Sequence, residues 1–222
     1  MAVARQAPDA DVKTCPGWKM VDLVGHTGAV HRWVTEVVRT RATERPHRAS
    51  GDEVPASIDT IGPWYEEGLN DLVSTLATTS LDLNVWNWAA GHPAPVGFWF
   101  RRMAQETVVH RCDAQNAAGQ ETVIDTEVAV DGIEEWLGFV TRQASNDPPQ
   151  AELSLVATDV DETWHLGLAP GLVSRQTSAG GGDLVRGPAS ELYLWLLHRP
   201  APGVSIVGEG KAVEAWGAVK FE

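Results

Sequence analysis

The stretch that decides the fold is FWFRRMAQETVVHRCDA, residues Phe98–Ala114. It places Glu106 and His110 four positions apart, and on a helix that spacing puts both side chains on one face, one turn apart. A second stretch, CPGWKMVDLVGHTGAVHRW at Cys15–Trp33, offers His26 on an amphipathic helix of its own. Two imidazoles and one carboxylate form a three-ligand set that leaves an open position on a divalent metal ion. The two stretches together therefore predict a metal site between two helices.

The helix that carries Glu106 and His110 has polar residues where a core-facing helix normally carries Leu or Val. Burying such groups without partners is costly, so something should satisfy them. Asp113, one turn beyond His110, is either a further ligand or an acceptor that orients an imidazole, and a surface carboxylate is the third interpretation. The competing interpretation of the pair is an ordinary Glu106–His110 ion pair beside an unrelated His26. The spacing alone leaves these alternatives open.

Periodicity divides the chain into a helical part and a part with strands. Before SNDPP at 145–149, apolar residues recur at three- and four-residue steps, whereas several later segments alternate polar and apolar residues as strands do. The sequence therefore predicts an α+β fold, with a helical bundle over residues 1–145 and a small α+β domain over residues 150–222. The expected helices run from the PGW turn to about residue 45, then over 57–76, 96–118, 125–143, 188–199 and 211–219, and the expected strands over 153–159, 163–168, 172–176, 183–187 and 204–210.

The chain has 222 residues, enough to bury a core without disulfide bonds. Its formal net charge of −13 opposes binding to phosphate backbones or anionic membranes, so we expect neither a nucleic-acid nor a membrane partner. Cys15 and Cys112 are the two cysteines, and neither belongs to a CxxC motif. Without an apolar run of transmembrane length or a signal-peptide pattern, the sequence predicts a cytoplasmic protein with reduced thiols.

A long loop expected over residues 80–96 carries Trp86, Trp88 and His92. Loops of this length inside a compact domain are often functional. We expect these three residues to contact a cofactor. The alternative is core packing for the tryptophans and solvent exposure for the histidine.

Four motifs in this order resemble those of the mycothiol-dependent maleylpyruvate isomerase family, a branch of the DinB-like metalloenzymes. They are CPGW-x3-DLVGH, RRM-x2-E-x3-H-R-x-D-A, ATD-x4-W and GPASELYLWL-x2-R. The resemblance implies a DinB-like four-helix bundle followed by a small α/β C-terminal domain. It also implies a divalent metal, usually zinc, bound by His26, Glu106 and His110. The family usually has a full helix before the CPGW turn, and here 14 residues precede Cys15.

The chemistry that the resemblance implies is thiol-dependent cis–trans isomerisation of maleylpyruvate. The thiol is mycothiol, the low-molecular-weight thiol of actinobacteria, and its thiolate adds to the cis double bond before rotation and elimination. An anionic substrate needs a cation, which Arg186 or Arg199 in the C-terminal part would supply. The alternative for each arginine is an ordinary surface residue.

The function predicted from the sequence is that of a metal-dependent isomerase or S-transferase that uses mycothiol or a similar thiol. Its partners are then a small thiol and a small anionic substrate, and the chain is a monomer or a homodimer. One alternative is a non-catalytic metal- or ligand-binding protein whose C-terminal domain holds an apolar molecule. A second alternative is a metal-dependent hydrolase.

Overall fold

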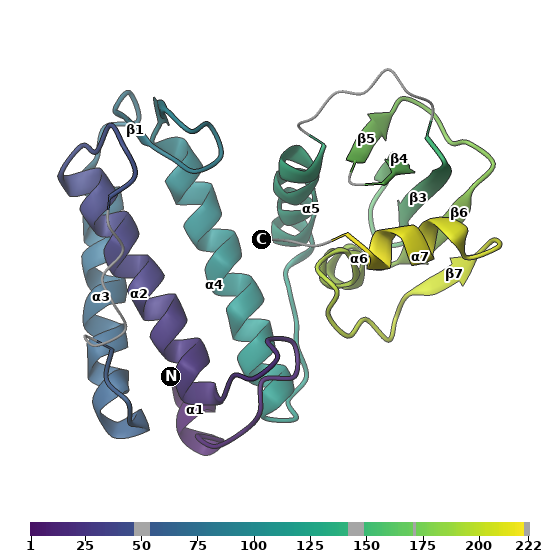
Figure 1. Cartoon of the computed structure of the whole chain (residues 1–222). Helices are drawn as coiled ribbons and strands as arrows, with labels where there is room; N and C mark the ends of the chain where they lie inside the picture. The colour runs from purple at the N-terminus through teal and green to yellow at the C-terminus, as the bar shows by residue number, and fades with distance from the viewer. Residues whose placement is uncertain (47–53, 142–148, 171, 220–222) are drawn as a thin grey trace. The chain divides into compact units, whose positions relative to one another are not determined.

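The computed structural model of the chain describes residues 1–46, 54–141, 149–170 and 172–219. Contacts between Cα atoms divide the chain into two compact units, Met1–Thr122 and Val123–Glu222 (Figure 1). Within the described residues, no helix combines the length and the apolar character needed to cross a membrane.

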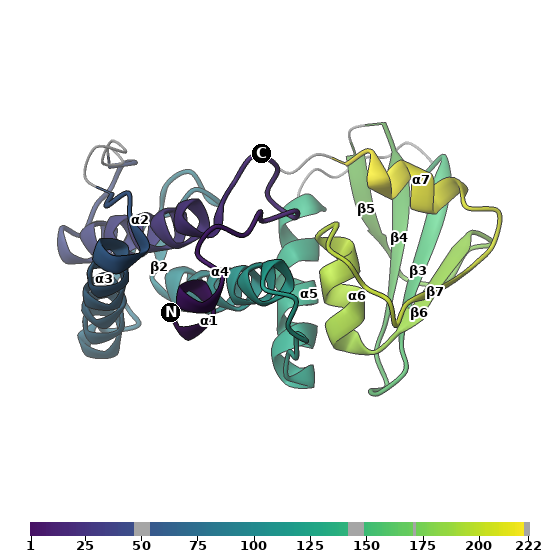
Figure 2. The same cartoon turned by 90° about the horizontal axis from the view of Figure 1, so that it is seen from below.

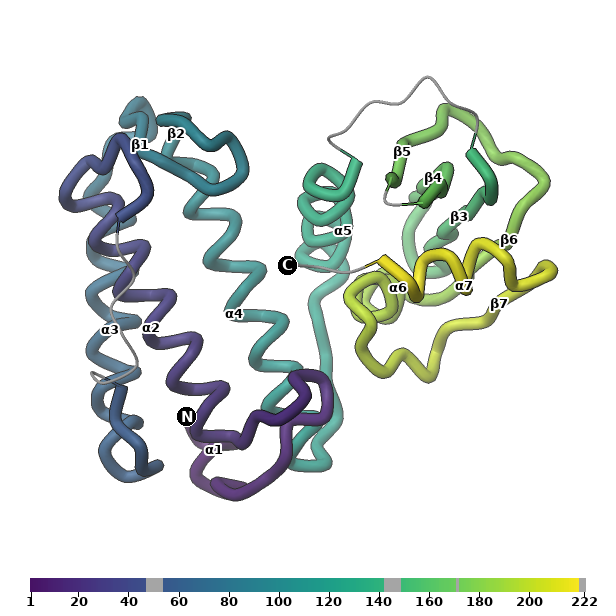
Figure 3. Tube along the Cα trace, in the orientation of Figure 1, coloured from purple at the N-terminus to yellow at the C-terminus, as the bar shows by residue number. Residues whose placement is uncertain are grey.

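The first unit is built from helices and one short hairpin. Helix α2 packs along α3, α4 lies against α2, and the hairpin β1–β2 stands between α3 and α4 in the chain (Figures 1 and 3). The short helix α1 contacts both α2 and α4. In chain order the elements are α1 (Ala2–Gln6), α2 (Met20–Arg39), α3 (Ile58–Thr78), β1 (Asn84–Trp86), β2 (Pro93–Pro95) and α4 (Gly97–Ala117).

The turn before α2 fixes how that helix begins. Gly17 has a φ of +85°, a left-handed conformation that glycine adopts without strain. The backbone N–H of Lys19 then donates to the Asp22 carboxylate at 2.8 Å, which caps the first turn of α2. The PGW turn therefore sets where α2 starts, and with it the position of His26 one turn beyond Asp22.

Helix α2 ends at Arg39, so the expected continuation to about residue 45 is wrong. Arg41 has a φ of +50°, and the N–H of Ala42 donates to the carbonyl of Val37 at 3.0 Å. This pairing closes a helix end through a left-handed residue. A left-handed residue cannot continue a right-handed helix, and the apolar periodicity of the sequence does not record it.

In the residues that the structure describes, the second unit has a five-stranded sheet and three helices. The strand order is β5-β4-β3-β6-β7, in which β3 and β6 are parallel and the other neighbours antiparallel (Figure 2). Helix α5 packs on α6 and contacts β5, while α7 contacts β3 and β4. The elements are α5 (Thr126–Val140), β3 (Ala151–Ala157), β4 (Thr163–Ala169), β5 (Leu172–Gln176), β6 (Asp183–Gly187), α6 (Ala189–Leu196), β7 (Ser205–Val207) and α7 (Lys211–Gly217).

The predicted α+β class is confirmed, with helices in the first part and the sheet in the second. The strands at Leu172–Gln176 and Asp183–Gly187 match their predicted bounds, whereas β7 covers only Ser205–Val207 of the strand expected over 204–210. The expected boundary near 145–150 falls mostly in 142–148, outside the described residues, and stays a prediction. Helix α5, which we expected in the bundle, makes its contacts with α6 and β5 in the second unit.

Asp183, the first residue of β6, ties the sheet to α7. Its buried carboxylate accepts the backbone N–H groups of Gly210 at 2.8 Å, Ala212 at 2.6 Å and Val213 at 3.1 Å. Burial raises the pKa of this carboxyl, but the backbone N–H groups lower it further, so the net shift is downward. Gly208, with a φ of +137°, passes so close to this carboxylate that a Cβ there would collide with it.

Replacing Asp183 with Ala should lower the free energy of unfolding by about 1–3 kcal/mol, because three backbone N–H groups lose their acceptor. Urea denaturation followed by tryptophan fluorescence measures the change. The control is Asp161→Ala, which removes an exposed carboxylate of the same unit and should change the stability by less than about 0.5 kcal/mol. Equal effects of the two substitutions would contradict the capping role.

Candidate metal centre

The three side chains that the sequence predicted as metal ligands meet between α2 and α4. Glu106 Oε1 lies 3.4 Å from His26 Nε2 and 3.2 Å from His110 Nε2. The three ligand atoms all lie within 4.8 Å of one another. All three residues are partly buried, and all belong to the first unit.

The spacing of these atoms fits a zinc ion. Zinc binds histidine nitrogen at about 2.0–2.1 Å and carboxylate oxygen at about 2.0–2.2 Å, so two such ligands at a tetrahedral angle stand about 3.3–3.5 Å apart. The observed 3.2 and 3.4 Å lie close to this separation; the first is at the long end of the range for N–H···O hydrogen bonds and the second is beyond it. One carboxylate oxygen facing two imidazole nitrogens is a donor set for a divalent ion with a position left open.

A second group of donor atoms, from Cys15, His110 and Asp113, overlaps the first one. His110 Nδ1 lies 2.9 Å from Asp113 Oδ2, which is the length of a direct hydrogen bond and too short for two ligands of one zinc ion. Cys15 Sγ lies 4.0 Å from the same oxygen, beyond the roughly 3.5 Å expected between sulfur and oxygen ligands of zinc. The group formed by His26, Glu106 and His110 is therefore the better metal site.

Two buried charged side chains adjoin the three ligands. Arg102 Nη2 donates to Glu106 Oε2 at 3.2 Å, and His110 Nδ1 donates to Asp113 Oδ2 at 2.9 Å. Asp113 is 1% exposed, so its interpretation as a surface carboxylate is wrong. Arg102 was missed at the sequence level, although its position four residues before Glu106 would have signalled the contact.

The metal-free site favours a charged carboxylate and a charged imidazole. Burial raises the pKa of Glu106, but the hydrogen bonds from His110 and His26 and the charge of Arg102 outweigh it and hold the pKa well below its usual range. Burial lowers the pKa of His110, but the hydrogen bonds to Asp113 and Glu106 outweigh it and raise the pKa to about 9. His110 is therefore positively charged at neutral pH, with a proton on both ring nitrogens, and a metal ion must displace one of these protons to bind.

His31 lies one turn beyond the site on α2 and behaves differently. It is fully buried, its Nε2 lies 3.3 Å from Thr107 Oγ1, and its ring stands beside Tyr65. Burial lowers the pKa of His31 to about 4, so it is neutral at physiological pH. Thr107 Oγ1 donates to the Met103 carbonyl, which leaves it free to accept from His31. His31 therefore acts as a neutral core residue.

Trp18 of the CPGW motif is an aromatic neighbour of the site, and the periodicity of the sequence did not predict this contact. Its ring centroid lies 4.8 Å from that of His26. Both residues line an open pocket of about 630 Å³, whose other walls include Gly25 and the segment 54–56. A smaller pocket of about 260 Å³, lined by α1, α2, α3 and α4, reaches His110. One ligand of the site therefore borders each pocket.

The three residues expected at a cofactor lie around the β1–β2 hairpin. Trp86 is 7% exposed and belongs to the hydrophobic core, where the Trp99 indole N–H donates to its carbonyl at 2.9 Å. Trp88 is 45% exposed, with its ring against Phe98. His92 is exposed, and its Nδ1 lies 3.0 Å from the Pro93 carbonyl. Their role at a cofactor therefore stays a prediction.

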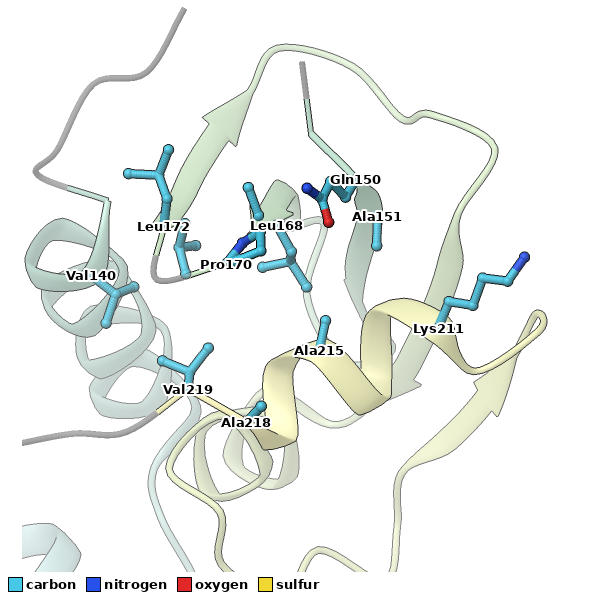
Figure 4. A pocket seen from close by; sticks show the side chains of 12 residues that line it. Val140, Gln150, Ala151, Leu168, Pro170, Leu172, Lys211, Ala215, Ala218 and Val219 are labelled. Carbon is cyan, nitrogen blue, oxygen red and sulfur yellow. The ribbon is translucent and has the colours of Figure 1, made fainter. Parts of the chain in front are cut away.

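The two arginines expected at the substrate belong to the second unit. Arg186 is exposed on β6, and Arg199 is half-buried after α6, where its Nη1 donates to the Leu197 carbonyl at 2.8 Å. The same unit holds a separate pocket of about 760 Å³, shown in Figure 4. Its walls are mainly apolar, with Lys211 at one end.

Comparison with known proteins places the chain in a family. The family model described as "Mycothiol maleylpyruvate isomerase N-terminal domain" matches residues 1–115, which include His26, Glu106 and His110. Among curated proteins, none matches. The crystal structure of the mycothiol-dependent maleylpyruvate isomerase is 15% identical, with a TM-score of 0.63 and an alignment that covers 92% of this chain and 86% of that chain. A histidine-to-alanine mutant of that isomerase gives 14% identity, a TM-score of 0.61 and the same coverage.

At these identities the structural likeness establishes the shared fold, and the predicted DinB-like isomerase fold is confirmed. The family model spans more than half of the 222 residues and includes the whole candidate site. The chain therefore belongs to the mycothiol maleylpyruvate isomerase N-terminal domain family, as its motifs predicted.

Proposed function

We propose that this protein is a metal-dependent enzyme that uses mycothiol, or a similar low-molecular-weight thiol, to isomerise a small anionic substrate of the maleylpyruvate type. The observation that carries the proposal is the convergence of His26 Nε2, Glu106 Oε1 and His110 Nε2 at ligand spacing. The family match and the fold of the isomerase whose structure is known support the reaction class. Zinc is the expected metal, because nitrogen and oxygen ligands in a three-residue set suit it.

The charges around the site favour an anionic fourth ligand. Arg102 offsets Glu106, and Asp113 adds one negative charge, so a divalent ion with two neutral histidines leaves a net charge of plus one. A thiolate would neutralise this charge. A divalent ion supplies the positive charge that lowers the pKa of a thiol toward neutral pH.

The protein's own residues would hold and shield the reactants. His26, Glu106 and His110 hold the ion, and the open pocket beside Trp18 and His26 gives a thiol a route to it. The indole of Trp18 stands beside the imidazole of His26, with ring centroids 4.8 Å apart, and would form one wall of that route. Trp88 and His92, both exposed, and the buried Trp86 remain proposed contacts of the thiol. Arg186 and Arg199 remain proposed partners of the substrate's carboxylates.

A second candidate function is the binding of an apolar molecule without turnover. The observation in its favour is the pocket of about 760 Å³ in the second unit, where Val140, Leu168, Leu172 and Val219 provide apolar walls (Figure 4). A carrier would bind its ligand there without needing a thiol. A hydrolase would use the same three ligands, also without a thiol, so dependence on the thiol separates the proposal from both alternatives.

Zinc binding should become tighter as the pH rises from 7 to 9. The raised pKa of His110, about 9, means that the imidazole must lose a proton before it binds a metal ion. The apparent affinity should therefore rise up to about tenfold per pH unit and level off above pH 9. Calorimetry near pH 7, in buffers of different ionisation enthalpy, should report about one proton released per ion. A pH-independent affinity would contradict the proton on His110.

The raised pKa of His110 should also make the metal-free protein less stable as the pH rises. Because the folded state raises the pKa of His110, the stabilisation is complete below about pH 6.5 and is lost as the pH rises through about 9. Metal-free protein should therefore lose stability over the pH range in which its affinity for zinc increases.

Addition of mycothiol to the cobalt-substituted protein should produce a thiolate-to-cobalt charge-transfer band, because a thiolate fills the open position. Glu106→Ala should lose both the bound cobalt and the band, since it removes the central ligand. Glu121→Gln, at an exposed position of the same unit, is the control and should behave as wild type.

Two outcomes would overturn the proposal. One is a wild-type protein that binds cobalt yet shows no spectral change at saturating mycothiol while hydrolysing an ester or amide, which would favour the hydrolase. The other is an apolar ligand that binds tightly to a protein without turnover of any thiol-dependent substrate, which would favour the carrier.

A further inference from the structure

Each of the two ligands on α4 has a charged partner on the same helix. Arg102 precedes Glu106 by four residues, and Asp113 follows His110 by three. Both spacings put the partners on one face of the helix. Arg102, Glu106, His110 and Asp113 therefore form one continuous row along the buried side of α4.

Arg102 and the two histidines contact different oxygens of the Glu106 carboxylate. Oε2 accepts from Arg102 Nη2 at 3.2 Å, whereas Oε1 faces His26 Nε2 and His110 Nε2. A carboxylate held in this way offers one oxygen to an ion and keeps the other on the guanidinium. This arrangement favours a low coordination number, which leaves room for a further ligand.

Asp113 fixes the orientation of the His110 ring. Its Oδ2 accepts the proton on His110 Nδ1 at 2.9 Å, so that Nε2 is the nitrogen left to face Glu106 and His26. Cys15 Sγ approaches the same oxygen at 4.0 Å. Since this hydrogen bond fixes the ring orientation and keeps the Nδ1 proton in place, Nε2 is the nitrogen that gives up its proton when an ion binds.

Arg102 and Asp113 differ from ordinary surface ion pairs because they are buried. Arg102 is 8% exposed and Asp113 is 1% exposed, whereas the Arg39–Asp71 pair of the same unit is more than half exposed. Desolvation makes a buried ion pair a weak source of stability, and apolar residues of similar size often do as well or better. The buried charges of Arg102 and Asp113 are better explained by a role in orienting Glu106 and His110, which lie between them.

We propose that Arg102 and Asp113 are positioning residues, which hold Glu106 as a one-oxygen ligand and His110 as an Nε2 ligand. The inference rests on the metal site of the proposed function and goes beyond it, because it assigns a role to residues that touch no ion. It holds for the isomerase, the transferase and the hydrolase alike, since each uses the same three ligands.

Zinc affinity and the cobalt spectrum test this inference on the full-length chain. At pH 9 and above, where the extra proton on His110 no longer competes, Asp113→Ala and Arg102→Met should each weaken zinc binding about 10- to 100-fold in competition with a chromophoric chelator. Arg102→Met should also weaken the visible absorption of the cobalt form, because a freed Glu106 can bind through both oxygens and raise the coordination number. The conservative variants Asp113→Asn and Arg102→Lys should keep part of the affinity and remain informative if the first pair does not fold.

The matched controls are Asp71→Asn and Arg101→Met, which remove exposed charges from α3 and α4. Both should bind zinc within twofold of wild type. Folded Asp113 and Arg102 variants with wild-type affinity and an unchanged cobalt spectrum would overturn the positioning role and leave the proposed function intact. A wild-type protein that binds neither zinc nor cobalt would overturn both.

Discussion

One carboxylate oxygen, Glu106 Oε1, lies between two histidine nitrogens from different helices, and the candidate site depends on it. At 3.4 Å from His26 on α2 and 3.2 Å from His110 on α4, it links two helices that are far apart in the sequence. A carboxylate in such a partly buried place needs compensation. The histidines and Arg102 provide it, and their contacts hold the pKa of Glu106 well below its usual range. The two nitrogen–oxygen distances are also close to those expected between ligands of one divalent ion.

This arrangement explains why the first unit tolerates polar residues on the buried face of α4. The rest of its core is conventional, with valines of α2 packed on Leu72 and on the tryptophans near the hairpin. The short turn at Gly17 and the cap at Asp22 start α2 at a fixed point, so that His26 arrives opposite Glu106. The turn before α2, the packing of the helices and the compensation of charges therefore all favour the same arrangement of the site. A sequence specifies one structure when such local and long-range preferences coincide.

The sequence predicted the parts of this geometry that periodicity records. Glu106 and His110 were paired by their four-residue spacing, and the strands at Leu172–Gln176 and Asp183–Gly187 by their alternation. Periodicity could not record the left-handed Arg41 that ends α2, the approach of Trp18 to His26, or the burial of Trp86 in the core. These features depend on single backbone conformations and on contacts distant in sequence. The choice among the three interpretations of Asp113 likewise needed its burial and its distance from His110.

Anomalous X-ray diffraction at the zinc edge, from crystals grown with zinc, tests the central claim most directly. We expect one strong peak within about 2.2 Å of His26 Nε2, Glu106 Oε1 and His110 Nε2, with Asp113 still bonded to His110 Nδ1. A crystal without a peak at saturating zinc, or with a peak ligated by Cys15 and Asp113 in place of His26 and Glu106, would contradict it.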